Sequence, residues 1–211
     1  FVGCVCRNTG DDSFAVIGFQ SPADYAYNVR FYDCHAYNAG FRGFALQAVK
    51  QVVVANCSVE GSVGSGIEVS VESDDDTSVF NEDVVIRSCD IRDAISSPGP
   101  VGAFNIYFTK RALVEGVTVT NPVNGSCVAL FDFDDVQLKD VQTIVTRTGF
   151  ARGIFVYDGL TIVGRTPRTN WGALSIDSAA FNMTQSDNSE AIHVKPNAAY
   201  TISNLLITGA T

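Results

Sequence analysis

Short apolar segments recur along this chain with small and polar residues between them. Eight segments share one order, a small residue followed by apolar, variable and apolar positions, and they lie at 13–16, 43–46, 66–69, 103–106, 127–130, 153–156, 173–176 and 191–194. Apolar residues at alternate positions are typical of strands. A unit that returns every ~20–35 residues is typical of a solenoid, in which each turn packs against its neighbours. The pattern predicts that the first apolar residues of the segments lie in register inside the fold, namely Phe14, Phe44, Ile67, Phe104, Val128, Ile154, Leu174 and Ile192.

A second repeated segment lies between the first ones and carries a polar residue or glycine between two apolar stretches. The residues at this bend position are Gly3, Asp33, Asn56, Ser88, Gly116, Asp140 and Asn204. These residue types tolerate a left-handed backbone or hydrogen-bond their own main chain, so they suit a bend between short strands. The combined pattern predicts an all-β, single-stranded parallel β-helix of about eight coils. A β-sandwich also has regularly spaced short strands, but it does not require the same segment to recur so often.

The length of 211 residues predicts one domain, so 1–211 is interpreted as a single parallel β-helix domain. The chain opens within a repeat at Phe1, and no capping helix follows the last strand near Leu205. Open ends of a solenoid need covering. We therefore expect this domain to be a piece of a longer chain.

The charge balance narrows the range of partners. The chain has 14 basic and 23 acidic residues and a net charge of −9. Nucleic-acid binding depends on clustered Lys and Arg, so a nucleic-acid partner is not expected. No apolar run reaches the ~18 residues of a membrane span, so membrane insertion is not expected either.

The cysteines follow the repeat. Cys4, Cys34, Cys57 and Cys89 occupy one inward column, which predicts buried thiols that behave as part of the apolar core. Disulfides between stacked coils are the alternative, but parallel stacked side chains rarely reach the dihedral angle that a disulfide needs.

No metal site or cofactor is predicted. The two histidines fall in different columns, and no Cys or His pair has the spacing of zinc ligands on one loop. The acidic segment 72–76 carries carboxylates of the kind that bind Ca²⁺, but it lacks the spacing of an EF-hand loop.

The outward positions of the first segments are rich in aromatic residues at Tyr107, Phe131, Phe155 and Tyr157. Flat aromatic side chains on an exposed sheet suit stacking against sugar rings, and they also suit a subunit interface. The sequence leaves both interpretations open.

Acidic residues gather at one end of the same face. Asp11 and Asp12 precede the first strand, and Glu68 lies about two coils further on, with Arg42 between them. Two coils separate groups by roughly 10 Å along the axis. Glycoside hydrolysis uses a pair of carboxyl groups ~5–10 Å apart, and a nearby Arg keeps a carboxylate ionised. Ordinary turn aspartates and a solvated Glu68 are the alternative interpretation.

The segment 10–16, Gly-Asp-Asp-Ser-Phe-Ala-Val, resembles the Gly-Asp-Asp-Cys-Ile-Ala-Ile signature of polygalacturonase-type glycoside hydrolases. These are right-handed parallel β-helix enzymes of the pectin-lyase-like superfamily. The resemblance implies that this chain is also a right-handed β-helix and that Asp11 and Asp12 serve as catalytic acid and base. The chain departs from that family in the next two coils. It has Phe-Arg-Gly at 41–43 in place of Gly-His-Gly, and Glu-Val-Ser at 68–70 in place of Arg-Ile-Lys.

Phage tailspikes belong to the same superfamily and lack the full polygalacturonase motif set. This chain is similar to them in those departures, in its uneven coils with a long insert at 71–83, and in its aromatic sheet face. The resemblance implies a homotrimer, or assembly with other virion subunits, located outside the cell or on a virion surface.

Together these features predict recognition and hydrolysis of an extracellular polysaccharide by a tailspike-like depolymerase or related glycosidase. The predicted catalytic residues are Asp11, Asp12 and Glu68, and the predicted substrate-binding residues are Arg42, Asn105, Tyr107, Phe131 and Tyr157. The alternative is a non-catalytic structural or receptor-binding virion component that uses its β-helix face for oligomer contacts.

Overall fold

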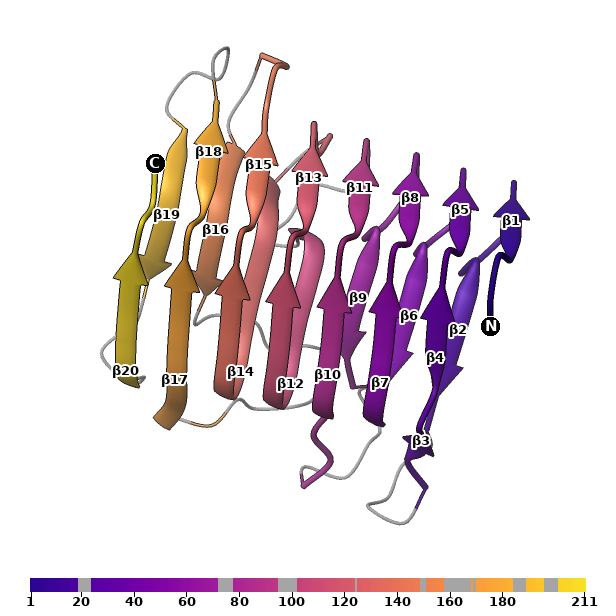
Figure 1. Ribbon diagram of the computed structural model, residues 1–211, viewed down its shortest axis with the longest axis horizontal. Coiled ribbons are helices and arrows are strands. Elements are labelled where there is room, and N and C mark those ends of the chain that lie inside the picture. The colour runs from indigo at the N-terminus through magenta and orange to yellow at the C-terminus, as the bar shows by residue number, and fades with distance from the viewer. Residues whose placement is uncertain are drawn as a thin grey trace.

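The computed structural model describes residues 1–18, 24–71, 78–94, 102–123, 125–148, 151–157, 168, 170–183, 189–195 and 201–211. The secondary structure in these ranges consists of strands and bends without a helix, and the strands stack as successive coils (Figure 1). The strand pairs found there are all parallel. This confirms the predicted single-stranded parallel β-helix.

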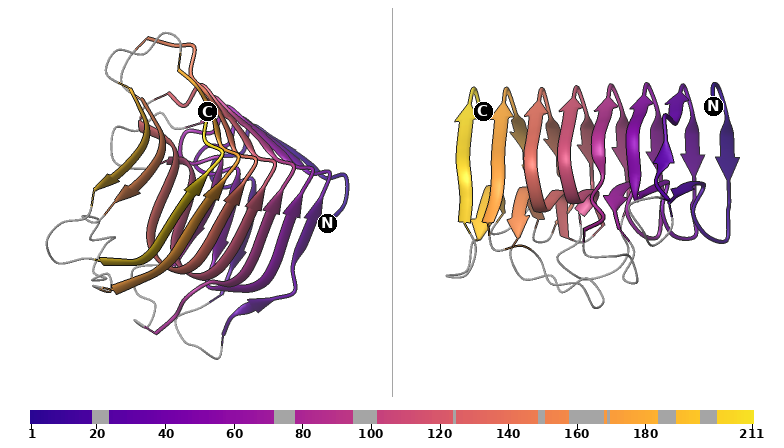
Figure 2. Two further views of the ribbon diagram at one scale, coloured as in Figure 1. Left: turned by 60° about the vertical axis from the view of Figure 1, so that its left-hand side comes forward. Right: turned by 90° about the horizontal axis from the view of Figure 1, so that it is seen from below.

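The strands form three faces, and Figure 2 shows the coils stacked along one axis with the two termini at opposite ends. Face 1 contains β2 (Phe14–Ile17), β6 (Phe44–Gln47), β9 (Ile67–Ser70), the first parts of β12 (Gly102–Glu115) and β14 (Gly125–Lys139), β16 (Ala151–Tyr157) and β19 (Glu190–Lys195). Face 2 contains β3 (Ala26–Tyr27), β4 (Arg30–Tyr32), β7 (Val49–Ala55), β10 (Glu82–Arg87), the second parts of β12 and β14, β17 (Asn170–Asp177) and β20 (Thr201–Thr208). Face 3 contains β1 (Val5–Arg7), β5 (His35–Tyr37), β8 (Ser58–Glu60), β11 (Asp90–Arg92), β13 (Thr118–Thr120), β15 (Gln142–Ile144) and β18 (Ala180–Asn182).

Single residues turn the chain from face 1 to face 2. Ala48, Phe108 and Asp132 have left-handed backbone with φ of 50°, 49° and 45°. Phe108 and Asp132 lie inside β12 and β14, so these two long strands run continuously from one face to the next. The corner therefore needs no loop in those coils.

The inward column of face 1 is in register as predicted for seven of its eight residues. Phe14 pairs with Phe44, and their rings stack with centroids 4.7 Å apart. The column continues through Ile67, Phe104, Val128, Ile154 and Ile192. The prediction for Leu174 is wrong, because Leu174 pairs with Val136 and Leu205 on face 2. The segment 173–176 alternates apolar and variable residues as the other segments do. Strands of face 1 and of face 2 both show this alternation, so the pattern does not tell which face a strand belongs to.

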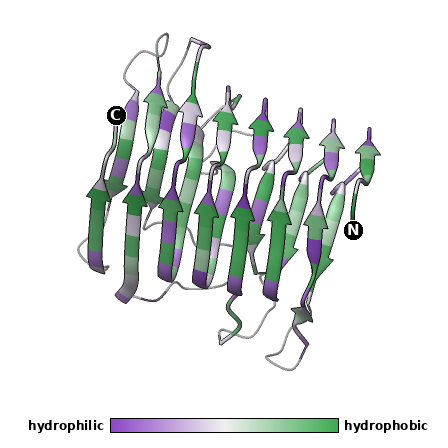
Figure 3. Ribbon diagram, viewed as in Figure 1, coloured by the Kyte–Doolittle hydropathy of each residue, from purple (hydrophilic) through white to green (hydrophobic). Residues whose placement is uncertain are grey.

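The bends between faces 2 and 3 occupy a second column. Six predicted bend residues have left-handed backbone, with φ between 51° and 63°: Gly3, Asp33, Asn56, Ser88, Gly116 and Asp140. The prediction for Asn204 is wrong, because this residue lies within β20, and the last two bends are at Ser178 and Gly209. Hydrophobic residues follow the bodies of the strands and hydrophilic residues occupy many strand ends (Figure 3).

The inward cysteine column is also confirmed. Cys34, Cys57 and Cys89 are buried, Cys4 is partly buried, and the six cysteines are free thiols. A hydrogen bond with Cys57, followed by burial, raises the pKa of the Cys89 thiol. These thiols pack as apolar core between successive bends.

The acidic segment 72–76, considered above for Ca²⁺, lies outside the described residues. Within the described ranges, no helix has the length and hydrophobicity that crossing a membrane requires.

Candidate functional site

Four polar residues follow one another across the outward side of face 1, at the N-terminal end of the solenoid. Asp12 and Arg42 lie two residues before Phe14 and Phe44, which are paired, so they occupy adjacent coils. Glu68 in β9 lies next to Asn105 in β12. We call Asp12, Arg42, Glu68 and Asn105 the polar row. It runs along the solenoid axis because each member comes from a different coil.

Arg42 is the centre of the polar row. Its Nε and Nη2 atoms donate to Oδ1 and Oδ2 of Asp12, both at 2.9 Å, and its Nη1 donates to Oε1 of Glu68 at 2.7 Å. The Arg42 backbone N–H also donates to Asp12 Oδ1 at 3.0 Å. Burial alone would lower the pKa of Arg42, but the hydrogen bonds and charges of the two carboxylates raise it above its usual range. Arg42 is therefore held as a fixed cation between two carboxylates.

Glu68 accepts hydrogen bonds from four different side chains. Besides Arg42, Oε1 accepts from Ser70 Oγ at 3.1 Å. Its Oε2 accepts from Ser65 Oγ at 3.1 Å and from Asn105 Nδ2 at 3.2 Å. The Glu68 side chain is 15% exposed, compared with 9% for both Asp12 and Arg42. Glu68 is thus the most accessible charged group of the three, and its orientation is fixed on both oxygens.

Asn105 lies beneath the polar row and is fully buried. Its Nδ2 also donates to Ser65 Oγ at 2.5 Å, and its Oδ1 accepts from the backbone N–H of Gly102 at 2.6 Å. The amide is saturated by contacts within the chain. Asn105 therefore orients Glu68, and in this structure it is not accessible to a ligand.

Two buried polar atoms beside the row have no hydrogen-bond partner within the described part of the chain. They are the Tyr107 hydroxyl and Oε1 of Gln47. Gln47 Nε2 donates to Ser70 Oγ at 3.3 Å, which connects Gln47 to Glu68 through Ser70. Burial, followed by the charge of Glu68, raises the pKa of Tyr107 well above its ordinary value. Leaving such a group unpaired costs about 1–3 kcal/mol.

The predicted aromatic platform is not open to solvent. Tyr107, Phe131 and Phe155 are 4%, 0% and 2% exposed. Tyr107 packs edge-on against Phe131, whose ring in turn packs against Trp171 with centroids 5.6 Å apart. The expectation of an exposed face is therefore wrong for these three residues. Tyr157 keeps partial exposure at the end of β16 and remains a candidate for sugar stacking.

Asp11 lies in the bend before β2 and is exposed, and its side chain has no hydrogen bond or ion pair within the described ranges. The structure thus brings Asp12, Arg42, Glu68 and Asn105 together and leaves Asp11 at the edge of the row. Sequence reasoning missed Ser65 and Ser70. Ser65 occupies the same column as Arg42, two residues before the inward residue of its strand, so the column pattern could have identified it.

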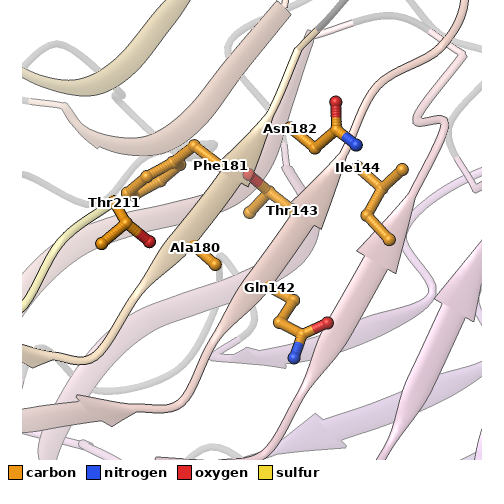
Figure 4. Close-up of a pocket in the computed structure, with 7 residues that line it drawn as sticks. All are labelled: Gln142, Thr143, Ile144, Ala180, Phe181, Asn182 and Thr211. Carbon is orange, nitrogen blue, oxygen red and sulfur yellow. The ribbon is translucent and has the colours of Figure 1, made fainter.

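A pocket on face 3 lies away from this site. It is lined by residues of β15 and β18 and by the last residue of the chain, and Figure 4 shows these side chains. The lining residues are Gln142, Thr143, Ile144, Ala180, Phe181, Asn182 and Thr211. None has a titratable side chain, so the pocket lacks groups for acid–base chemistry.

The family pattern described as "Right handed beta helix region" matches residues 1–140. The chain belongs to this right-handed β-helix family. The match confirms both the handedness and the predicted superfamily resemblance. A search of curated proteins gave no match.

A solved structure supports the same fold. The A-module of mannuronan C-5 epimerase AlgE6 from Azotobacter vinelandii is similar to this chain with a TM-score of 0.61 and 16% identity. The similarity covers 100% of this chain and 57% of the epimerase chain. A catalytic domain of a GH87 alpha-1,3-glucanase has a TM-score of 0.45 and 15% identity, covering 98% of this chain and 44% of its own. This chain therefore spans about half the length of both proteins.

Proposed function

We propose that this chain binds a polysaccharide along the outward side of face 1 and hydrolyses a glycosidic bond at the polar row. The observation that carries the proposal is the set of contacts that fixes Glu68 and Asp12 on either side of Arg42. The similar epimerase structure is named for action on mannuronan, a polysaccharide, which agrees with the proposal.

The contacts suggest a division of roles between the carboxyl groups. Both oxygens of Asp12 accept hydrogen bonds from Arg42, which fixes the orientation of this carboxyl group, and we assign it as the base or nucleophile. Asp11 is the neighbouring exposed carboxyl group, and we assign it as the acid because the resemblance to polygalacturonase-type enzymes implies an acid and base pair at these two positions. Glu68 anchors Arg42 from the next coil and presents the most accessible carboxylate of the polar row to the sugar. Asn105, Ser65 and Ser70 act as positioning residues because they contact Glu68.

The proposal is tested by assaying a panel of soluble polysaccharides for the release of reducing ends. Asp11→Asn and Asp12→Asn should each lower kcat at least about 100-fold, because acid–base groups contribute about that much or more. The matched control is Glu115→Gln, which changes an exposed carboxylate at the end of β12 and should leave the rate unchanged. Melting of Asp11→Asn should match the wild type. Full activity in the Asp11/Asp12 double variant would remove this site assignment.

A non-catalytic role is the second candidate, and one observation favours it. The hydrogen-bonding groups of Arg42 named above are directed to carboxylates of the chain itself, as in an ion-pair network that serves stability. In that case the chain would bind a polysaccharide or a virion partner without cleaving it. Binding without release of reducing ends, unaffected by Asp12→Asn, would support this candidate.

The tailspike-like role, with a homotrimer located outside the cell or on a virion surface, stays a proposal that follows from the resemblance. Because Tyr107 and Phe131 are buried within one chain, a trimer would have to use another surface. Sedimentation of the purified chain tests the assembly. A monomer at micromolar concentration would count against the trimer.

A further inference from the structure

A second cluster of charged residues lies at the C-terminal end of face 1, formed by Arg152 in β16 and by Glu190 and His193 in β19. Oε2 of Glu190 accepts a hydrogen bond from Arg152 Nε at 2.8 Å and lies 2.5 Å from Nδ1 of His193. The His193 ring packs against Phe155, with centroids 5.2 Å apart. We call Arg152, Glu190 and His193 the His193 cluster.

The contacts of the cluster determine which nitrogen of His193 carries the proton. Glu190 is held as an anion, since the hydrogen bond from Arg152, and then that from His193, lower the pKa of Glu190. A carboxylate only accepts hydrogen bonds, so Nδ1 of neutral His193 must be the donor. The lone pair then lies on Nε2. This atom has no hydrogen-bond partner within the described part of the chain, and the His193 side chain is 24% exposed.

The His193 cluster lies in the same outward columns as the polar row. Glu68, Asn105, Ala129, Phe155 and His193 follow one another in register across five strands. Four strand spacings separate Glu68 from His193 by roughly 19 Å along the axis. The outward residues of the coils between Glu68 and His193 are buried, with Asn105 and Ser126 at 0%, Ala129 at 1% and Phe155 at 2% exposure. A linear ligand that spans this distance along the axis would therefore contact Glu68 and His193 and not the sheet between them.

We propose that the His193 cluster is a second sugar-binding subsite, in which His193 Nε2 accepts a hydrogen bond from a hydroxyl of the polysaccharide. This inference rests on the proposed function. Glu190 and Arg152 are positioning residues for the imidazole. Tyr157, which packs against Phe155 with ring centroids 5.1 Å apart, supplies a partly exposed ring at the same end of the face.

Long-range proton–nitrogen NMR spectra of the two histidines at pH 8 test the arrangement without a ligand. His193 should carry its proton on Nδ1 in the wild type. In Glu190→Gln a larger share of His193 should carry the proton on Nε2, because an amide can donate to Nδ1 while a carboxylate cannot. A wild-type spectrum with the proton of His193 on Nε2 overturns the proposal.

Binding is measured with oligosaccharides of mannuronan, of α-1,3-glucan and of any polysaccharide that the wild type cleaves. His193→Gln should weaken binding about tenfold, as expected for the loss of one hydrogen bond, and ligand should shift the Nε2 signal of His193. The matched control is His35→Gln on face 3, where Nδ1 of His35 lies 2.8 Å from Ser58 Oγ, and binding should not change.

The outcomes separate the two proposals. If Glu68→Gln weakens binding and His193→Gln does not, the subsite is refuted and the proposed function stands. If none of the oligosaccharides binds the wild type, both are refuted.

Discussion

Arg42 brings a positive charge into a region where its own side chain is only 9% exposed. Removing charged groups from water is unfavourable unless they are paired with good geometry. Asp12 and Glu68 supply that pairing from the two neighbouring coils. Each of the three residues therefore depends on the other two, although they are far apart in the sequence.

Arg42→Met is expected to lower the free energy of unfolding by about 3–5 kcal/mol, because it leaves two carboxylates without their cation. Denaturant unfolding of the purified variant measures the loss. The control is Arg92→Met, since Arg92 forms its ion pair with Asp90 at a side-chain exposure of 59%. That variant should lose less than about 1 kcal/mol. Equal losses in both variants would show that the buried ion pairs of Arg42 contribute no more to the free energy of unfolding than the exposed ion pair of Arg92.

At the scale of the strand and bend, glycine has two different uses in this fold. Gly116 occupies a bend with φ of +61°, and an added Cβ would meet no atom closer than 3.8 Å. Gly43 precedes β6, where an added Cβ would lie 2.5 Å from the Gly66 carbonyl oxygen and 2.5 Å from Val59 Cγ1. The first glycine relieves backbone strain, and the second allows neighbouring coils to approach closely.

This difference predicts unequal losses on substitution with alanine. Gly116→Ala should lower the free energy of unfolding by about 1 kcal/mol through backbone strain alone. Gly43→Ala should lower it by about 3 kcal/mol, because backbone atoms of the next coil must shift. Thermal or denaturant unfolding of the two variants checks the order. A smaller loss in Gly43→Ala than in Gly116→Ala would mean that the coils are packed less tightly than described.

For the whole molecule, the repeat made most of the fold predictable. Each coil repeats the same apolar inward positions and the same kind of small or polar bend residue. Seven of eight inward residues and six of seven bends could therefore be placed from the sequence. The errors at Leu174 and Asn204 arose where the alternating pattern fits two faces equally well. The grouping of Asp12, Arg42 and Glu68 also followed from the columns. The burial of Phe131 did not, because it depends on Trp171, which comes from a later coil and carries no repeat signal.

The stability of the whole molecule should fall in acid. A hydrogen bond from Arg111 lowers the pKa of Asp83 below its usual value. Burial raises the pKa of Glu82, but hydrogen bonds from Lys110 and Lys50 outweigh it and lower the net value. A carboxyl with a lower pKa in the folded state stabilises it above the unfolded pKa, and this contribution is lost as the pH falls through the folded value.

The free energy of unfolding is therefore expected to decrease as the pH falls below about 4, by less than about 1 kcal/mol for each exposed pair. Denaturant titrations at pH 6, 4 and 3 measure the decrease. Asp83→Asn should show a smaller decrease than the wild type, whereas Glu115→Gln should behave like the wild type. A stability that rises between pH 6 and pH 3 would contradict the assignment of these pairs.

The register of face 1 fixes the distance along the axis between the polar row and the His193 cluster. The spacing between the polar row and the His193 cluster is set by the number of intervening turns, and not by any flexible connection. A homologue that gains or loses one turn in this interval by recombination would keep both groups of residues intact while changing the distance between them. Under the proposed function, the size of the released fragments would then change in steps of one strand spacing.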